Sequence, residues 1–321
     1  MNLMKLSSLK IQQNPISYFD EKVINSLASS LYTFHFGSEA VTIWPKTVQL
    51  LNLFELGIFN LTLEELPETA FANLSLSWLS LNSMKLLRLP SSFKGLENLF
   101  TLSLNTDEDL TLDGIPSTLF ERFKGLNWLQ IINVKLTALP DIFHYVTGLF
   151  QLEINSVPVS DFPGNMMPED SNITIANFNG TLFNEVPTAF SKMKKLSVLS
   201  LNYNNITTLR SADLSGLSEL EYISISNAPL ESVSLDAFRT LTSLSYIALD
   251  NTALTTIPRA VEGVKFDYLS LLGNKLICTC QSMGWMKNWP DASRVGINGQ
   301  CNNLDSMQVG VYVRQKVPEC P

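Results

Sequence analysis

The sequence has few of the side chains that catalyse reactions. It contains only two histidines, His35 and His144, which lie in the second and sixth repeats of the pattern described below and so cannot form a catalytic triad or a paired-histidine metal site. It has no G-x-G-x-x-G or G-x-x-x-x-G-K-S/T loop of the kind that binds phosphate. All four cysteines follow residue 277, and pairing among them would leave no thiol nucleophile. These absences predict a chain that is not an enzyme and that uses no metal or cofactor.

Charge and long apolar runs are also scarce. Charged residues make up 16% of the chain, and 22 lysines and arginines against 30 aspartates and glutamates give a net charge of −8, which argues against a nucleic-acid partner. A membrane helix needs ~18 uninterrupted apolar residues, whereas even the stretch from Leu50 to Leu63 is interrupted by Glu55 and Asn60. We therefore expect no membrane span in this chain. The 45% of apolar residues instead predict a packed core.

The densest acidic group is the run Asp107-Glu108-Asp109. Paired carboxylates can hydrolyse glycosidic bonds or bind Ca²⁺. This run, however, lies in an insertion that lengthens its repeat to 27 residues, and a charge run in a loop is usually solvated. We interpret it as a solvated loop.

A repeated pattern of leucines organises the chain. The segment from Leu196 to Leu209 fits the template L-x-x-L-x-L-x-x-N-x-L at every fixed position, and the positions are numbered here from 1 at the first leucine. Twelve such units follow one another in steps of 21 to 27 residues. Their first positions are Leu6, Leu31, Leu53, Leu76, Leu99, Leu126, Leu149, Asp170, Leu196, Leu220, Leu244 and Phe266. Asp170 is the only polar residue in this series and predicts a degenerate eighth repeat.

Prolines give a second, independent signal. A proline follows the last template hydrophobe in most units, and it ends the strand because it cannot donate a ladder hydrogen bond. These prolines are Pro45, Pro67, Pro90, Pro116, Pro140, Pro163, Pro187 and Pro258. Each unit is thus predicted to be a short strand, a turn and a return segment, and no unit can bury its apolar stripe without a neighbour. The pattern predicts an α/β fold, a curved solenoid with a parallel sheet on its concave side.

This pattern resembles that of extracellular leucine-rich repeat proteins, and the resemblance covers nearly the whole chain. It implies a horseshoe-shaped leucine-rich repeat solenoid that recognises partners. The chain departs from the family at position 9, where a buried asparagine ladder is usual. Asparagine occupies this position only at Asn14, Asn204 and Asn274. The backbone polar groups of the other turns must therefore be satisfied in another way.

The four cysteines mark a different region, because Cys278-Thr-Cys280, Cys301 and Cys320 all follow the last repeat. Four cysteines allow three pairings. The Cys-x-Cys start and the tryptophan-rich segment after it resemble the cysteine-rich C-terminal cap of secreted and receptor-ectodomain solenoids, and this resemblance implies the pairs Cys278–Cys301 and Cys280–Cys320. A zinc site is the alternative, but zinc ligands usually come as two close C-x₂₋₄-C pairs.

We therefore predict a repeat array over residues 1–276, without an N-terminal cap, and a cysteine-rich cap over 277–321. The start of the chain lacks the apolar stretch of a secretory signal, and Met1 lies inside a recognisable repeat. We expect a truncated form of a secreted or extracellular protein. Its first strand, Ser8 to Ile11, would then be an open edge through which the chain can self-associate.

Disulfides imply an oxidising compartment, which agrees with secretion. Five N-x-S/T sequons predict a glycoprotein, although about as many occur by chance at this composition. The candidate glycosylation sites are Asn60, Asn73, Asn172, Asn179 and Asn205.

Positions 2, 3, 5, 7 and 8 of each unit are predicted to project from the concave side of the sheet, because neighbouring residues alternate across a strand. Aromatic residues form two groups there: a stripe ~20 Å long across five repeats, and a column at position 3 near the C-terminus. Gln130 and Asn133 can add polar contacts beside Trp128, and Glu153 adds negative potential to this face. Asn172 is expected between the two groups, where a glycan would divide the face. The stripe is Phe54, Trp78, Phe100, Trp128 and Phe150, and the column is Tyr222, Tyr246 and Tyr268.

Two interpretations of these aromatic groups are compatible. Cross-strand ring pairs stabilise a sheet by ~0.2–1 kcal/mol each, and exposed apolar patches mark interaction sites. We predict an extracellular recognition module that binds a protein or a glycan through its concave face. The alternative is a non-catalytic accessory subunit that stabilises a secreted enzyme, similar in outline to the leucine-rich non-catalytic subunit of a secreted luciferase.

Overall fold

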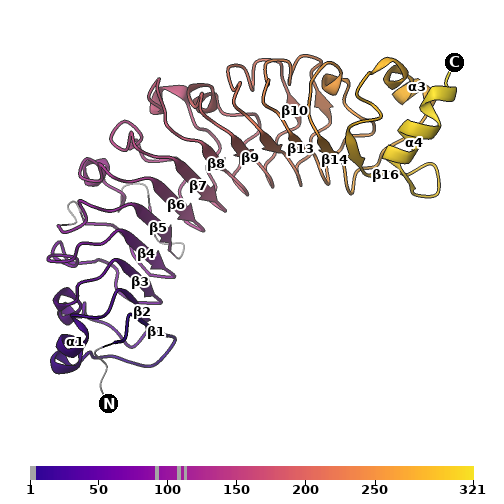
Figure 1. The fold of residues 1–321 in the computed structure, drawn as a ribbon. Coiled ribbons are helices and arrows are strands. Elements are labelled where there is room, and N and C mark those ends of the chain that lie inside the picture. The colour runs from indigo at the N-terminus through magenta and orange to yellow at the C-terminus, as the bar shows by residue number, and fades with distance from the viewer. Residues whose placement is uncertain (1–4, 91–93, 107–109, 112–113) are drawn as a thin grey trace. The chain divides into compact units, whose positions relative to one another are not determined.

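The computed structural model describes residues 5–90, 94–106, 110–111 and 114–321, and the chain divides into two compact units, residues 1–159 and residues 160–321 (Figure 1). We call them unit 1 and unit 2. The acidic run Asp107-Glu108-Asp109 lies outside the described residues. The predicted boundary between repeat array and cap, at residue 276, lies within unit 2.

The described part of unit 1 contains seven strands in parallel register, ordered in space as they are in sequence. The strands are β1 (Ser8–Gln12), β2 (Thr33–Gly37), β3 (Glu55–Phe59), β4 (Trp78–Asn82), β5 (Thr101–Asn105), β6 (Trp128–Ile132) and β7 (Gln151–Asn155). The helices of the return segments are α1 (Glu21–Leu27), the 3₁₀ helix η1 (Lys46–Leu50) and α2 (Ser117–Phe120).

Unit 2 continues the same plan with shorter strands. Its main parallel sheet consists of β8 (Ile175–Asn177), β9 (Val198–Ser200), β11 (Tyr222–Ser224), β13 (Tyr246–Ala248), β14 (Tyr268–Ser270) and β15 (Gly296–Asn298). A second pair, β10 (Thr208–Leu209) and β12 (Ser232–Val233), is also parallel. The return segments contain the 3₁₀ helices η3 (Gly164–Met166), η4 (Thr188–Lys192) and η5 (Arg259–Val261).

The core lies on one side of each sheet and follows the template. Side chains at positions 1, 4 and 6 point toward the return segments and are buried in the fourth repeat, where Leu76, Leu79 and Leu81 are each 0% exposed. In the first repeat the same positions, Leu6, Leu9 and Ile11, are only half-buried. This alternation is the two-residue period of a strand. The predicted prolines act as the start of the return segments, since Pro45, Pro116 and other template prolines directly precede the helices η1, α2, η3, η4 and η5 in extended conformation.

The eighth repeat is not degenerate, and this corrects the predicted register. β8 pairs with β9 so that Ile175 faces Val198, which puts Ile173 rather than Asp170 at position 1. Ile173 is 1% exposed, as the template requires. Phe178, taken from sequence as the position 9 residue, is at position 6 and is fully buried. Apolar residues every few positions fit two registers here, and the pairing of the strands selects one.

The turns at position 9 are satisfied differently in the two units. In unit 1, Leu61, Met84, Val134 and Val157 fill this position and are at most 1% exposed. In unit 2, Asn204 accepts hydrogen bonds from the Thr181 hydroxyl and the Phe183 N–H, and donates to the Phe178 carbonyl at 2.7 Å. Asn274 repeats this with the Thr252 N–H and hydroxyl and the Leu249 carbonyl, at 2.6–2.8 Å. We call these bonds the position 9 ladder.

The C-terminal segment folds as a disulfide-bonded cap at the end of unit 2 (Figure 1). Cys278 pairs with Cys301 and Cys280 with Cys320, the pairs that the family resemblance implies. The cap adds strand β15 to the sheet beside β14, which extends the repeat array by one strand. Its other elements are α3 (Cys280–Met283), η6 (Gly284–Asn288), the antiparallel pair β16 (Gln300–Cys301) and β17 (Met307–Gln308), α4 (Val309–Gln315) and η7 (Val317–Glu319).

Candidate functional site

The candidate site is the face of each sheet that does not pack on the return segments, which we call the open face. Position 8 of many repeats has a left-handed backbone, with φ near +55° at Asn60, Asn133, Asn227 and Asn251. Asparagine tolerates this conformation better than most residues. Asparagine at these four positions is therefore partly a requirement of the turn rather than of a binding surface.

The five aromatic residues of unit 1 form two rows rather than one stripe. Glu55, Trp78, Thr101 and Trp128 face one another in register at position 3. Phe54, Phe100 and Phe150 precede this row by one residue, at position 2, and are 39%, 50% and 41% exposed. Because two strand spacings separate these phenylalanines, their rings recur about every 10 Å.

The two tryptophans pack against each other above the strand that separates them. Trp78 and Trp128 make an edge-to-face contact with ring centroids 5.5 Å apart. Thr101 lies between them in the register and is only 1% exposed although it is on the open face. Among the described residues, the buried Trp128 indole N–H has no nitrogen or oxygen partner. This half-buried pair therefore contributes to sheet packing, whereas the phenylalanines of position 2 are the exposed rings.

Tyr32 belongs to the exposed row and was missed in the sequence. It occupies position 2 of the second repeat, is 53% exposed, and stacks on Phe54 with centroids 4.7 Å apart and planes 7° from parallel. The repeat register could have identified Tyr32, since Tyr32 and Phe54 occupy the same template position. We call Tyr32, Phe54, Phe100 and Phe150 the aromatic row.

The carboxylates of the unit 1 open face are bonded to their neighbours. Glu153 accepts hydrogen bonds from the amides of Gln130, at 2.9 Å, and Gln151. Glu55 accepts from the Thr33 hydroxyl and contacts the imidazole of His35 at 2.8 Å. Gln130 and Glu153, two of the predicted binding residues, thus hold each other in place beside the aromatic row.

The open face of unit 2 has a different construction. Tyr222, Tyr246 and Tyr268 stack in register, with successive centroids 5.1 Å apart and planes within 20° of parallel. We call them the tyrosine column. Burial chiefly, together with the charges of the two flanking tyrosines, raises the pKa of Tyr246 above its ordinary value. The Tyr246 phenol is therefore neutral at physiological pH.

A second ladder runs beside the tyrosine column at position 7. The side-chain amide oxygen of Asn179 accepts hydrogen bonds from the Ser200 hydroxyl and the Asn202 backbone N–H. Asn202 accepts in the same way from Ser224 and Ser226, at 2.6 and 2.7 Å. Asp250 closes the series with the Ser270 hydroxyl and the Leu272 N–H, also at 2.6 and 2.7 Å. We call these bonds the position 7 ladder.

The predicted glycosylation sites are not equivalent. Asn73, Asn172 and Asn205 are exposed, whereas Asn60 and Asn179 are half-buried. Asn172 is not on the open face, because the corrected register places it one residue before position 1, where it accepts a bond from Lys195. A glycan on Asn172 would therefore not divide that face as the sequence suggested.

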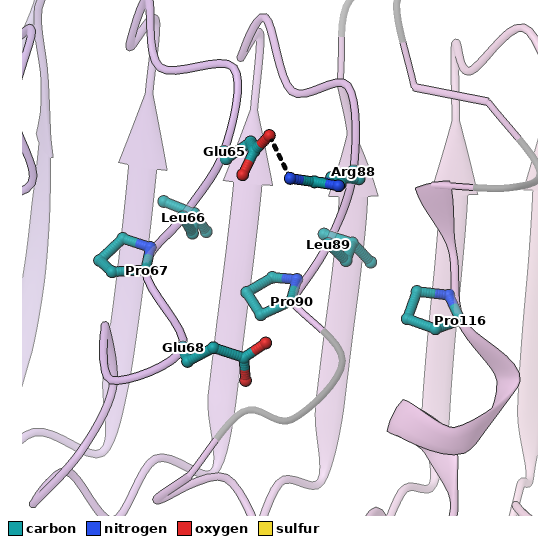
Figure 2. Close-up of a pocket in the computed structure, with 8 residues that line it drawn as sticks. All are labelled: Glu65, Leu66, Pro67, Glu68, Arg88, Leu89, Pro90 and Pro116. Carbon is teal, nitrogen blue, oxygen red and sulfur yellow. Dashed lines mark ion pairs between the residues drawn. The ribbon is translucent and has the colours of Figure 1, made fainter.

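A groove of about 540 Å³ lies on the return segments of unit 1 (Figure 2). Figure 2 shows Pro67, Pro90 and Pro116 in a row along it, with an ion pair of 2.6 Å between Glu65 and Arg88 above them. Each of these prolines belongs to the template, and the guanidinium is already neutralised by Glu65. The groove is thus a consequence of the repeat.

In the part of the chain that the structure describes, no three His, Cys, Asp or Glu side chains are grouped as metal ligands would be. No helix among the described residues is long and apolar enough to cross a bilayer.

Comparison with known proteins agrees with the repeat and the cap. A family model, Leucine rich repeat, matches residues 179–230. A stretch of 100 residues, 31% of this chain, is 33% identical to the high affinity nerve growth factor receptor of Mus musculus and corresponds to 12% of that protein. The chain thus spans only a small part of the length of the curated relatives it matches.

Solved structures share the fold over most of the chain. A chain in the octameric complex of Latrophilin 3, Unc5D and FLRT2 (LRR) superposes with a TM-score of 0.72 and 17% identity, covering 96% of this chain and 95% of that one. A chain of the mouse RP105/MD-1 complex superposes with a TM-score of 0.62 and 18% identity, covering 93% and 60%. The protein is a leucine-rich repeat solenoid with a disulfide-bonded, cysteine-rich C-terminal cap.

Proposed function

We propose that this chain is a non-catalytic extracellular recognition module that binds a protein partner through the open face of unit 1. The observation that carries the proposal is the aromatic row, whose four rings are 39–53% exposed next to hydrogen-bonded amides. Exposed apolar surface of this kind is typical of interaction sites, and large rigid rings supply most of the binding energy at such sites.

Three observations support the extracellular part of the proposal. Both disulfides require an oxidising compartment. The sequons at Asn73, Asn172 and Asn205 are on exposed residues that can carry glycans. The partly matching relatives are growth-factor receptors, and structural neighbours come from complexes of several proteins.

The test separates binding from packing. The chain is immobilised, a partner is recovered from the extracellular fluid of the source tissue, and its Kd is then measured for three variants. Phe100→Ala should weaken binding by ~1–2 kcal/mol without changing the melting temperature, because half of its ring is exposed. Trp128→Ala should weaken binding by ~2 kcal/mol and also destabilise the fold by ~1–2 kcal/mol, because it uncovers Thr101.

The matched control is Ile43→Ala, which removes an apolar side chain that is 80% exposed but lies outside the open face of unit 1. It should leave the Kd unchanged. Equal Kd values for wild type and Phe100→Ala would show that the partner binds elsewhere.

A further inference from the structure

The tyrosine column presents an ordered aromatic surface on the open face of unit 2. Its three rings are half-buried, so part of each ring remains accessible. The strand after the column carries glycine at the same register position: a Cβ on Gly296 would lie 2.7 Å from Cδ2 of Tyr268. The cap thus leaves room for the last ring to lie flat at the end of the column.

The charges around this column are all of one sign. Positions 2, 3, 5, 7 and 8 of repeats eight to twelve are all described, and they contain no Lys, Arg or His but three carboxylates, Glu221, Asp250 and Asp267. Asp267 is neutralised by Arg294 at 3.2 Å and accepts from Ser245. Among the described residues, Glu221 and Asp250 form no ion pair with a basic group.

The two unpaired carboxylates lie on opposite sides of the column. Glu221 is at position 2, one residue before the column, and Asp250 is at position 7, four residues after Tyr246 in the same repeat. Among the smaller causes of the raised Tyr246 pKa is the charge of Asp250, so this carboxylate acts on the column electrostatically.

The position 7 ladder does not need the charge of Asp250. Asn202, two repeats earlier, accepts from a position 5 serine and a position 7 N–H at the same distances of 2.6 and 2.7 Å. A neutral amide therefore performs the same structural task. Compared with an amide, the Asp250 carboxylate adds only a negative charge, and this charge lies in the repeats that carry the stacked tyrosines.

We propose that the open face of unit 2 binds a cationic segment of a protein partner, with a lysine or arginine side chain over the tyrosine column between Glu221 and Asp250. Aromatic faces attract cations through their quadrupole, and arginine also stacks on them. Two carboxylates that form no ion pair among the described residues favour the same charge. The proposal rests on the recognition role proposed above but uses a different surface.

The experiment measures binding of octa-arginine to the full chain by isothermal titration calorimetry at physiological ionic strength, with a Ser–Gly octapeptide and octa-glutamate as comparison probes. We expect octa-arginine alone to bind. Asp250→Asn, which keeps the ladder acceptor, should weaken its Kd at least fivefold, and Glu221→Gln should do the same. Tyr246→Ala should weaken it at least threefold, whereas Tyr246→Phe, which keeps the ring, should stay within twofold of wild type.

The matched control is Glu121→Gln, which removes one exposed carboxylate from a return segment of unit 1. An equal loss of affinity in Glu121→Gln and Asp250→Asn would show attraction to net charge only and would overturn the proposal, as would a failure of octa-arginine to bind. Phe100→Ala should not affect this titration. Loss of the unit 1 partner with octa-arginine binding intact, or the reverse, therefore shows which of the two proposals fails.

Discussion

In unit 1 the position 9 turns close over Leu61, Met84, Val134 and Val157, whereas in unit 2 the same turns are held by Thr181, Asn204, Thr252 and Asn274. An apolar residue there adds buried area but leaves the turn's polar groups to find other partners. An asparagine instead satisfies N–H and carbonyl groups of the preceding repeat directly. One backbone geometry is therefore compatible with two different chemistries.

The open faces of the two units also differ in how far their side chains bond to one another. In unit 2, the position 7 ladder and the tyrosine column engage most side chains with one another. In unit 1, the rings of the aromatic row leave 39–53% of their surface uncovered. Unit 2 thus presents an acidic surface whose side chains are bonded to one another, and unit 1 presents a more exposed, apolar one.

The largest expected effect concerns the cap. Replacing Cys280 and Cys320 by serine opens a loop with a sequence separation of 40, and should destabilise unit 2 by ~4 kcal/mol through the greater freedom of the unfolded chain. Hydrogen exchange measured by mass spectrometry should show the loss in unit 2 amides. Serines at Cys278 and Cys301, with a separation of 23, should cost slightly less. An equal loss of protection throughout unit 1 would mean that both units unfold together.

Exchanging the two turn chemistries should have the next largest effect. Asn204→Leu leaves the Phe183 N–H and the Phe178 carbonyl buried without this partner, and should cost ~3 kcal/mol. Val134→Asn, the reverse exchange, buries an amide among apolar neighbours and should cost ~2 kcal/mol. Urea unfolding followed by circular dichroism measures both. A stability unchanged in Asn204→Leu would show that the position 9 ladder is dispensable and that the contrast between the units is only one of composition.

The smallest expected effect comes from adding a Cβ at a glycine that lies close to an aromatic ring, at one site in each unit. A Cβ at Gly57 would lie 2.8 Å from His35 and Phe59 ring atoms, and one at Gly296 would lie 2.7 Å from Tyr268. Alanine at either site should destabilise the chain by ~1 kcal/mol, since the ring must move. Gly125→Ala is the control, because its Cβ would meet only an ordinary contact at 3.7 Å. Thermal unfolding should separate the first two variants from the third.

Much of the fold is predictable because the same sequence pattern recurs in every repeat. The buried positions 1, 4 and 6 and the prolines before the return helices follow from strand alternation and from the chemistry of proline. The eighth repeat was misread because Ile173 and Ile175 also fit a register that begins at Asp170. Only the pairing of β8 with β9 distinguishes the two, and pairing is not local information.

The candidate site was predicted less completely. The sequence identifies which residues face outward, but it does not show that Trp78 and Trp128 lean toward each other over Thr101. This side-chain direction depends on the small residue between them. The position 7 ladder could not be predicted from the sequence either. Asn202 and Asp250 are recognisable there only as polar residues, and the structure shows that their side-chain oxygens accept hydrogen bonds from equivalent groups of the next repeat.

The position 9 ladder also restricts how this array can be rearranged. Asn204 serves Thr181 and Asn274 serves Thr252, while Ala228 between them forms no such bond. The ladder therefore joins repeats in two pairs, the eighth with the ninth and the eleventh with the twelfth, and the tenth repeat belongs to neither. Deletion of one member of a pair would separate an asparagine from its threonine, whereas deletion of the tenth repeat would leave both pairs intact. Recombination that preserves these bonds should therefore move the two members of a pair together.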